Sequence, residues 1–225
     1  MGWKCGWSWA VLACLVACAP ANAQWYRDKW EVTPFVGVET SGSYPLTPTL
    51  NTVLVSELRA STGVSYGTFV DYSITTNAQF EFMWDRNPTS YSELQPPNPN
   101  YVKAYNSDIN QYQFGALYML FGPEHKWRPY IAGSVGFTHE SNSPLAGGTT
   151  SGATPNRTDF SFGLGGGVKY SVSKHIAFRG DARYMPTYAN SSLQQYCDPF
   201  YGCYTANGSN YQHRGNFVAG VVFSF

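Results

Sequence analysis

Charged residues recur at every second position in several segments of this 225-residue sequence. Alternation of this kind is typical of a β-strand, in which successive side chains point to opposite faces. The segment 176–185 places Arg179, Asp181 and Arg183 on one face and apolar or small residues on the other. Acids and bases gathered on one face can form ion pairs or line an ion path. Nine charges fall on such polar faces, namely Glu31, Glu39, Asp71, Glu81, Asp85, Lys169, Arg179, Asp181 and Arg183.

Hydrolytic chemistry would require a histidine beside a carboxylate or a serine, so that water or a hydroxyl group is activated. Among the four histidines, His139-Glu140-Ser141 is the one suggestive cluster, and His213 lies near the end of another strand. No further catalytic motif accompanies them. We therefore predict no catalytic residues and no enzymatic activity, and keep a hydrolase as the least favoured alternative.

The first 23 residues read as a targeting segment. Lys4 precedes an apolar run over residues 9–18, and Pro20 precedes Ala21-Asn22-Ala23. Small residues at Ala21 and Ala23 suit signal peptidase, so cleavage is predicted between Ala23 and Gln24. In an alternative interpretation, Leu15-Val16-Ala17-Cys18 is a lipobox and Cys18 is lipidated. The first interpretation leaves a single domain over residues 24–225.

Cleavage leaves two cysteines in the mature chain, Cys197 and Cys203. An even pair in an exported protein predicts a disulfide. A metal site would need further ligands, and the short loop between the cysteines offers only Asp198. No metal or cofactor is expected.

Eight segments have the alternation and the length of strands that cross a membrane at a tilt. They are residues 30–40, 62–74, 77–87, 109–121, 128–140, 158–172, 175–188 and 212–225. Short and long connections alternate strictly between them, and the long ones cover residues 41–61, 88–108, 141–157 and 189–211. Long connections on one rim alone are typical of an up-and-down membrane barrel. The architecture of a soluble sandwich does not require all long connections to lie at one end. Aromatic residues near the strand ends are expected in interfacial girdles, namely Trp30, Trp84, Trp127, Tyr130, Tyr170 and Tyr188.

Composition agrees with an all-β antiparallel transmembrane barrel. The mean hydropathy is −0.28, with 12% charged and 17% aromatic residues. A helical membrane protein would need spans of roughly 20 consecutive apolar residues. The 14 basic residues balance the 14 acidic ones, so no nucleic-acid partner is expected.

The last strand resembles the C-terminal insertion signal of bacterial outer-membrane barrels. Gly220, Phe223 and the terminal Phe225 match that signal, while Val218 stands where a polar residue is usual. Residues 24–225 as a whole resemble the small OmpA/OmpW-like, porin-family barrels. The resemblance implies the outer membrane of a Gram-negative bacterium, termini in the periplasm and long loops outside. It also implies outer-membrane lipid and the assembly machinery as partners, and a monomer is expected.

An eight-stranded barrel is just wide enough for side chains to fill its interior. The acids of the early strands and the bases of the late strands would therefore pair across the bore and plug it. This favours a structural role, or binding of an extracellular ligand at the tyrosine-rich loops 88–108 and 189–211. The alternatives are that these tyrosines merely stack to order the loops, and that the barrel is a small porin-like channel for ions or solutes.

Overall fold

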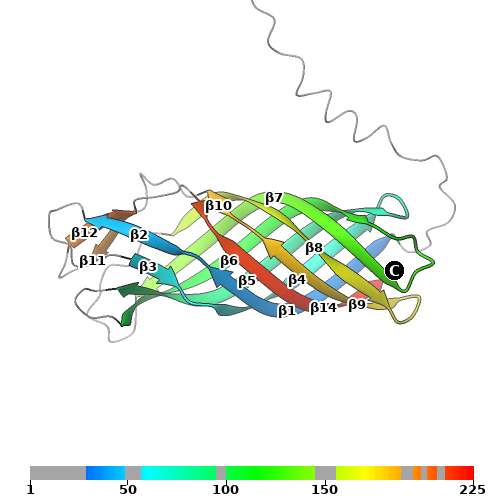
Figure 1. Cartoon of the computed structure of the whole chain (residues 1–225), viewed down its shortest axis with the longest axis horizontal. Coiled ribbons are helices and arrows are strands. Elements are labelled where there is room, and N and C mark those ends of the chain that lie inside the picture. The colour runs from blue at the N-terminus through cyan, green and yellow to red at the C-terminus, as the bar shows by residue number, and fades with distance from the viewer. Residues whose placement is uncertain are drawn as a thin grey trace, which may run out of the picture.

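A closed antiparallel β-barrel forms the body of the molecule (Figure 1). The computed structural model describes residues 29–48, 57–94, 100–144, 156–188, 195–198, 202–206 and 211–225. The wall contains β1 (Trp30–Ser41), β4 (Gly63–Ser73), β5 (Ala78–Leu94), β6 (Tyr101–Met119), β7 (Trp127–Pro144), β8 (Arg157–Ser171), β9 (Ile176–Tyr184) and β14 (Arg214–Ser224). Consecutive wall strands pair with each other, and β14 pairs with β1 to close the barrel. The predicted all-β, eight-stranded architecture is confirmed.

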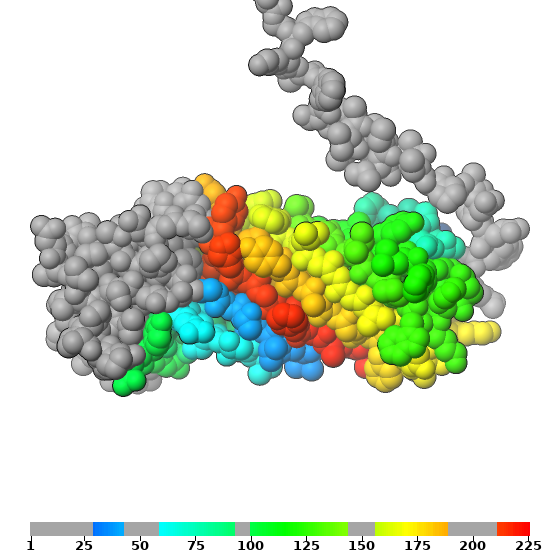
Figure 2. All heavy atoms as spheres, in the orientation of Figure 1, coloured from blue at the N-terminus to red at the C-terminus, as the bar shows by residue number. Residues whose placement is uncertain are grey.

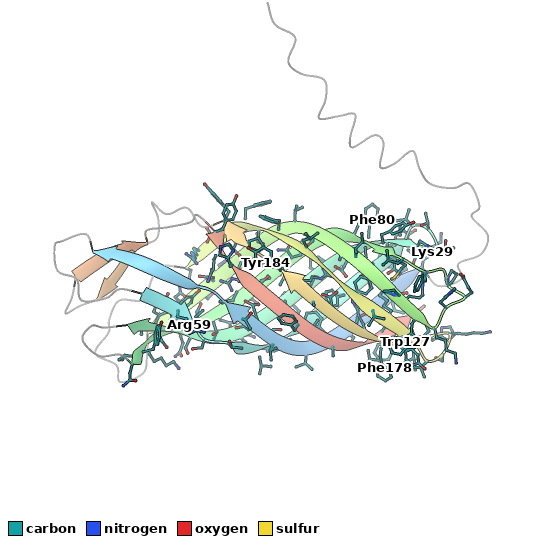
Figure 3. The ribbon with its side chains drawn as sticks, in the orientation of Figure 1. Lys29, Arg59, Phe80, Trp127, Phe178 and Tyr184 are labelled. Carbon is teal, nitrogen blue, oxygen red and sulfur yellow. The ribbon has the colours of Figure 1, made fainter. Side chains whose placement is uncertain are left out.

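The two ends of the barrel differ. Residues 74–77, 120–126 and 172–175 connect strands at one end, which also holds the C-terminus (Figure 1) and Lys29 (Figure 3). We call this the short-turn end and the opposite one the long end. At the long end, β5 runs to Leu94 and β6 begins at Tyr101. The prediction of a loop is therefore wrong for residues 88–94 and 101–108, because both strands continue their pairing well past the apolar part of the wall.

Short strands extend the wall at the long end. They are β2 (Ser43–Pro48), β3 (Glu57–Ala60), β10 (Thr187–Tyr188), β11 (Gln195–Asp198), β12 (Gly202–Ala206) and β13 (Tyr211–Gln212). β12 pairs with β2, β2 with β3, and β3 with the far end of β5. The long predicted loops at residues 41–61 and 189–211 thus carry strands of their own.

The wall has an apolar outer face and a polar inner face. Leu164 and Phe80 are 67% and 60% exposed on the outer face, whereas Asp71 and Asp85 are fully buried inside. Figure 3 shows Phe80, Phe178 and Trp127 directed away from the barrel, and Figure 2 shows a continuous covering of side chains over the wall in view. No helix in the described residues is long and apolar enough to cross a membrane.

Aromatic residues mark both margins of the apolar face. Trp30 packs on Tyr72, and Trp127 on Tyr170, at the short-turn end. Tyr188 and Tyr211 pack together toward the long end. Tyr130 was predicted to lie in a girdle, and this prediction is wrong. Its position on β7 has the inward parity, so its hydroxyl bonds to buried charges instead.

Barrel closure depends on the last strand. Phe225 and Trp30 exchange backbone hydrogen bonds of 2.9 and 3.1 Å. One Cβ atom added to Gly220 would lie 2.5 Å from the backbone oxygen of Pro34, so this position cannot carry a side chain without moving β1. Phe223 and Phe225 point outward on the apolar face.

Candidate functional site: the barrel interior

Alternation along the wall strands fills the barrel interior with polar side chains. On β9 the buried positions are Ala177, Arg179, Asp181 and Arg183, and the next buried residue is Met185. On β1, Glu31, Phe35 and Glu39 point inward in the same order along the barrel axis. Charged residues therefore occur at two levels, with an apolar level between them.

The first charged level, which we call the inner cluster, lies toward the short-turn end. It contains Glu31, Asp71, Glu81, Lys169, Arg179, Asp181 and Arg183. The Lys169 ammonium lies 2.9 Å from Asp71 Oδ2, donates to Gln79 Oε1 at 2.8 Å, and also contacts Glu31. One cation from β8 thus binds acids of β1 and β4, two strands on the opposite side of the barrel.

Arg179 connects the largest number of partners in the inner cluster. Its Nη1 lies 3.0 Å from Asp71 Oδ2, and its Nη2 lies 2.5 Å from Glu81 Oε2. Its Nε donates to the Tyr130 hydroxyl at 2.8 Å, and that hydroxyl donates to Asp181 at 2.5 Å. The guanidinium carbon stacks 3.7 Å above the centroid of the Phe69 ring.

Arg183 forms the remaining ion pairs of the inner cluster. Its Nη1 lies 2.5 Å from Glu81 Oε1, and its Nε lies 2.7 Å from Asp181 Oδ1. Glu81 therefore accepts from two guanidinium groups, and each guanidinium contacts at least two carboxylates. Charge-assisted bonds of this number and geometry compensate for removing the ions from water.

An apolar layer separates the two charged levels. It consists of Phe35, Phe69, Met83, Met185 and Val218. Asp85 lies just beyond it and accepts from Asn216 Nδ2 at 2.7 Å. Asp85 was predicted among the interior charges, and the structure pairs it with this amide rather than with a cation.

The second charged level, the outer cluster, joins Glu39, Glu140, Arg157 and Arg214. Arg214 Nη1 lies 3.0 Å from Glu39 Oε1, and Arg214 also contacts Glu140. Arg157 Nη2 lies 2.8 Å from Glu140 Oε2. Arg214 is 1% exposed despite its position close to the long end.

The structure places all nine predicted charges inside the barrel. Seven form the inner cluster, Glu39 belongs to the outer cluster, and Asp85 lies just beyond the apolar layer with Asn216. Sequence reasoning missed three interior charges for different reasons. Glu140 was treated as part of a histidine cluster, and Arg157 lies one residue before the predicted strand 158–172. Arg214 lies within the predicted strand 212–225 but was not assigned to its polar face. The alternation of inward and outward positions could have identified these residues. Glu140 lies an even number of residues from the inward Tyr130, and Arg214 from the inward Asn216.

The candidate catalytic cluster is divided by the barrel wall. Glu140 points inward to its arginine partners, while His139 contacts Thr158 and Ser141, at 2.8 and 3.3 Å, on the outer side. His213 hydrogen-bonds and stacks with Tyr184. Among the described residues, no three His, Cys, Asp or Glu side chains gather as a metal site would require.

Two tyrosines predicted on a binding loop lie inside the barrel. Tyr91 and Tyr105 are 1% and 4% exposed and stack with centroids 4.9 Å apart. For these two residues, the stacking agrees with the alternative in which the tyrosines order this segment. Tyr91 also accepts from Gln212 at 2.9 Å, which ties it to the outer cluster.

The two cysteines lie directly opposite each other in the β11–β12 pair. A disulfide remains a prediction, and intact-mass measurement checks it. The purified protein should be lighter by two hydrogens than the same sample after reduction, whereas an unchanged mass would contradict the disulfide.

Comparison with known families decides what kind of barrel this is. The family model described as "Outer membrane protein beta-barrel domain" matches residues 9–225. The chain belongs to this outer-membrane β-barrel family. The family places the protein in the outer membrane, in agreement with the predicted location. The predicted cleavage between Ala23 and Gln24, with Ala21 and Ala23 as its small residues, falls outside the described residues and stays a prediction. The alternative, lipidation of Cys18, falls outside them too.

Solved structures share the fold. OprG from Pseudomonas aeruginosa has a TM-score of 0.61 at 13% identity, covering 88% of this chain and 97% of OprG. AlkL in lipid bilayers has a TM-score of 0.52 at 14% identity, covering 92% of this chain and 95% of AlkL. Neisserial surface protein A has a TM-score of 0.51 at 18% identity, covering 87% of this chain and 97% of that protein. At these identities the similarity shows the small outer-membrane barrel fold alone. No curated protein matches the sequence.

Proposed function

We propose that this protein is a non-enzymatic outer-membrane barrel, closed along its axis, that presents its long end outside the cell as a binding surface. The observation that carries the proposal is the interior, where two charged clusters and an apolar layer occupy successive levels of the bore. A solute moving along the axis would have to break ion pairs at both levels.

Closure is supported by burial. Arg179, Arg183, Glu81 and Arg214 are all 5% exposed or less. An eight-stranded barrel leaves an interior that side chains can fill, and these side chains are large and mutually bonded. Separating such pairs without replacing their bonds is costly, because each ion has already left water.

The long end supplies the surface to be presented. β5 and β6 remain paired as far as Leu94 and Tyr101, and the β2–β3 and β11–β12 strands extend the sheet further. These elements stand at the long end of the barrel (Figure 1). Loops and strand ends held by a rigid scaffold are common binding surfaces.

Orientation can be tested with single cysteines in a Cys197→Ser/Cys203→Ser background. Ser143 is exposed near the long end, and Ser173 is exposed in a turn at the short-turn end. A membrane-impermeant maleimide should label Ser143→Cys on intact cells and Ser173→Cys only after permeabilisation. The reverse pattern would contradict presentation of the long end.

A non-enzymatic role is supported by the separation of His139 from Glu140 across the wall. The remaining candidate, His213, has Tyr184 rather than a carboxylate as its ring partner. Neither arrangement provides a histidine and carboxylate pair that could activate water.

One observation favours the second candidate, a small channel. Asp85 Oδ1, Gln111 Oε1 and Gln113 Oε1 are buried in the interior without a protein hydrogen-bond donor. Buried polar atoms of this kind commonly bind water. A channel would conduct through the unmodified protein, whereas a plugged barrel would conduct only after its ion pairs are removed.

A further inference from the structure

A polar groove opens on the outer face of the wall, beyond the apolar region on the side of β3, β5 and β6. Its volume is about 450 Å³. Its lining is rich in hydroxyl, amide and charged groups, including Ser61, Thr62, Ser90, Lys103, Asn106 and Asp108. None of these residues belongs to the interior clusters described above.

The groove arises from an interruption in strand pairing. The β4–β5 register ends at Tyr66 and Arg86, and the β3–β5 register starts at Ala60 and Tyr91. Between these pairs, residues 61–65 lie opposite residues 87–90 of β5, so the segment that joins β3 to β4 has one residue more than the facing part of β5. Pro88 lies in this stretch and has no backbone N–H to donate. The local bulge bends and twists the strands here, although the Ser61 N–H still donates to the Ser90 carbonyl at 2.9 Å.

The groove lies at the boundary of the apolar face. Along β5 the outward residues change from Phe82 and Trp84 to Arg86, and along β6 they change from Tyr112 to Asn110 and Asp108. Trp and Tyr concentrate at membrane–water interfaces. The groove therefore lies level with the headgroups of the surrounding lipid.

Lys103 lines the groove, and Arg59 lies near it on the same outward row. Arg59 pairs in register with Ser92, and Ser92 pairs with Lys103 on the next strand. Opposite positions on one face have Cβ atoms about 5 Å apart, so the two cations lie on either side of Ser92. Within the part of the chain that the structure describes, neither Arg59 nor Lys103 forms a salt bridge. Figure 3 shows Arg59 at the long end, away from Lys29.

The acid of the groove is already bound. Asp108 Oδ2 lies 2.5 Å from Arg86 Nη2, and both oxygens accept from this guanidinium. Arg59 and Lys103 therefore leave the groove with a surplus of positive charge next to several hydroxyl groups. This combination suits phosphate together with sugar hydroxyls, and it does not suit an apolar solute or a metal cation.

We propose that this groove binds the phosphorylated sugar headgroup of a glycolipid in the surrounding outer leaflet. Its position beside the apolar face places it where lipid headgroups are, and its lining supplies both phosphate and sugar partners. This inference rests on the proposed function, because it requires the long end to face outward. It goes beyond that function by naming a ligand class and the residues that recognise it.

The test uses the full mature protein in detergent micelles, with diphosphorylated lipid A as the probe and native mass spectrometry as the measurement. The variant Arg59→Gln/Lys103→Gln removes the lining cation Lys103 and its neighbour Arg59. The matched control Lys126→Gln/Lys174→Gln removes two exposed lysines at the short-turn end. Heat-modifiable migration on a denaturing gel verifies that each variant is folded.

Wild type and control should bind lipid A equally, and the groove variant should bind about tenfold more weakly, since two surface charge contacts are lost. Phosphatidylglycerol should bind all three proteins alike and more weakly. Equal binding by the groove variant, an equal loss in the control, or displacement of lipid A by a comparable concentration of pyrophosphate would overturn the proposal. Purified protein is used, so the result is separate from the orientation and conductance tests of the proposed function.

Discussion

Replacing Arg179 with methionine should lower the free energy of unfolding by about 3–5 kcal/mol, the range found when one partner of a buried ion pair is removed. The variant removes the cation that joins Asp71 to Glu81 and Asp181, so that Asp71 keeps only Lys169 and the other two acids keep only Arg183. Methionine retains much of the apolar contact with Phe69, so the loss reports on charge rather than on volume.

Urea unfolding of the protein in lipid vesicles, followed by tryptophan fluorescence, measures this change. Arg86→Met is the matched control, because Arg86 forms a close ion pair with Asp108 on the outer face, where water and salt screen it. Its effect should be much smaller. Equal effects of the two substitutions would show that burial inside the barrel does not distinguish them.

Alternation made the barrel predictable from sequence. On β9 and β8, each strand keeps one parity from end to end, so the order of residues alone assigns Arg179, Arg183 and Lys169 to the polar face. The short turns were equally clear, because Gly122, Pro123 and their neighbours interrupt the alternation.

Strand ends at the long end were not predictable in the same way. Residues 88–108 contain proline, serine and asparagine, which favour loops, yet pairing of β5 with β6 holds residues 88–94 and 101–108 in strands. The partners of each charge also required three-dimensional information. Tyr130 illustrates this, since an aromatic residue near a strand end suits either a girdle or an interior, and only the register settles its side.

Removing one arginine from each charged level should open the bore. Arg179→Ala/Arg214→Ala takes a large side chain from the inner cluster and another from the outer cluster. The acids left behind would recruit water and cations, and cation-selective unitary currents should appear. Arg59→Ala/Arg86→Ala removes the same number of charges from positions outside the bore and should not produce currents.

Each variant must be shown to be folded before its currents are interpreted. Closed outer-membrane barrels migrate differently on a denaturing gel before and after boiling, and this shift should persist in both double variants. Currents in the Arg59→Ala/Arg86→Ala protein would show that the conduction does not depend on the interior clusters.

Single-channel recording of the unmodified protein in planar lipid bilayers tests the central claim most directly. The two charged levels predict insertion without any steady unitary current. A stable unitary current from the unmodified protein would contradict the closed barrel and favour the small channel.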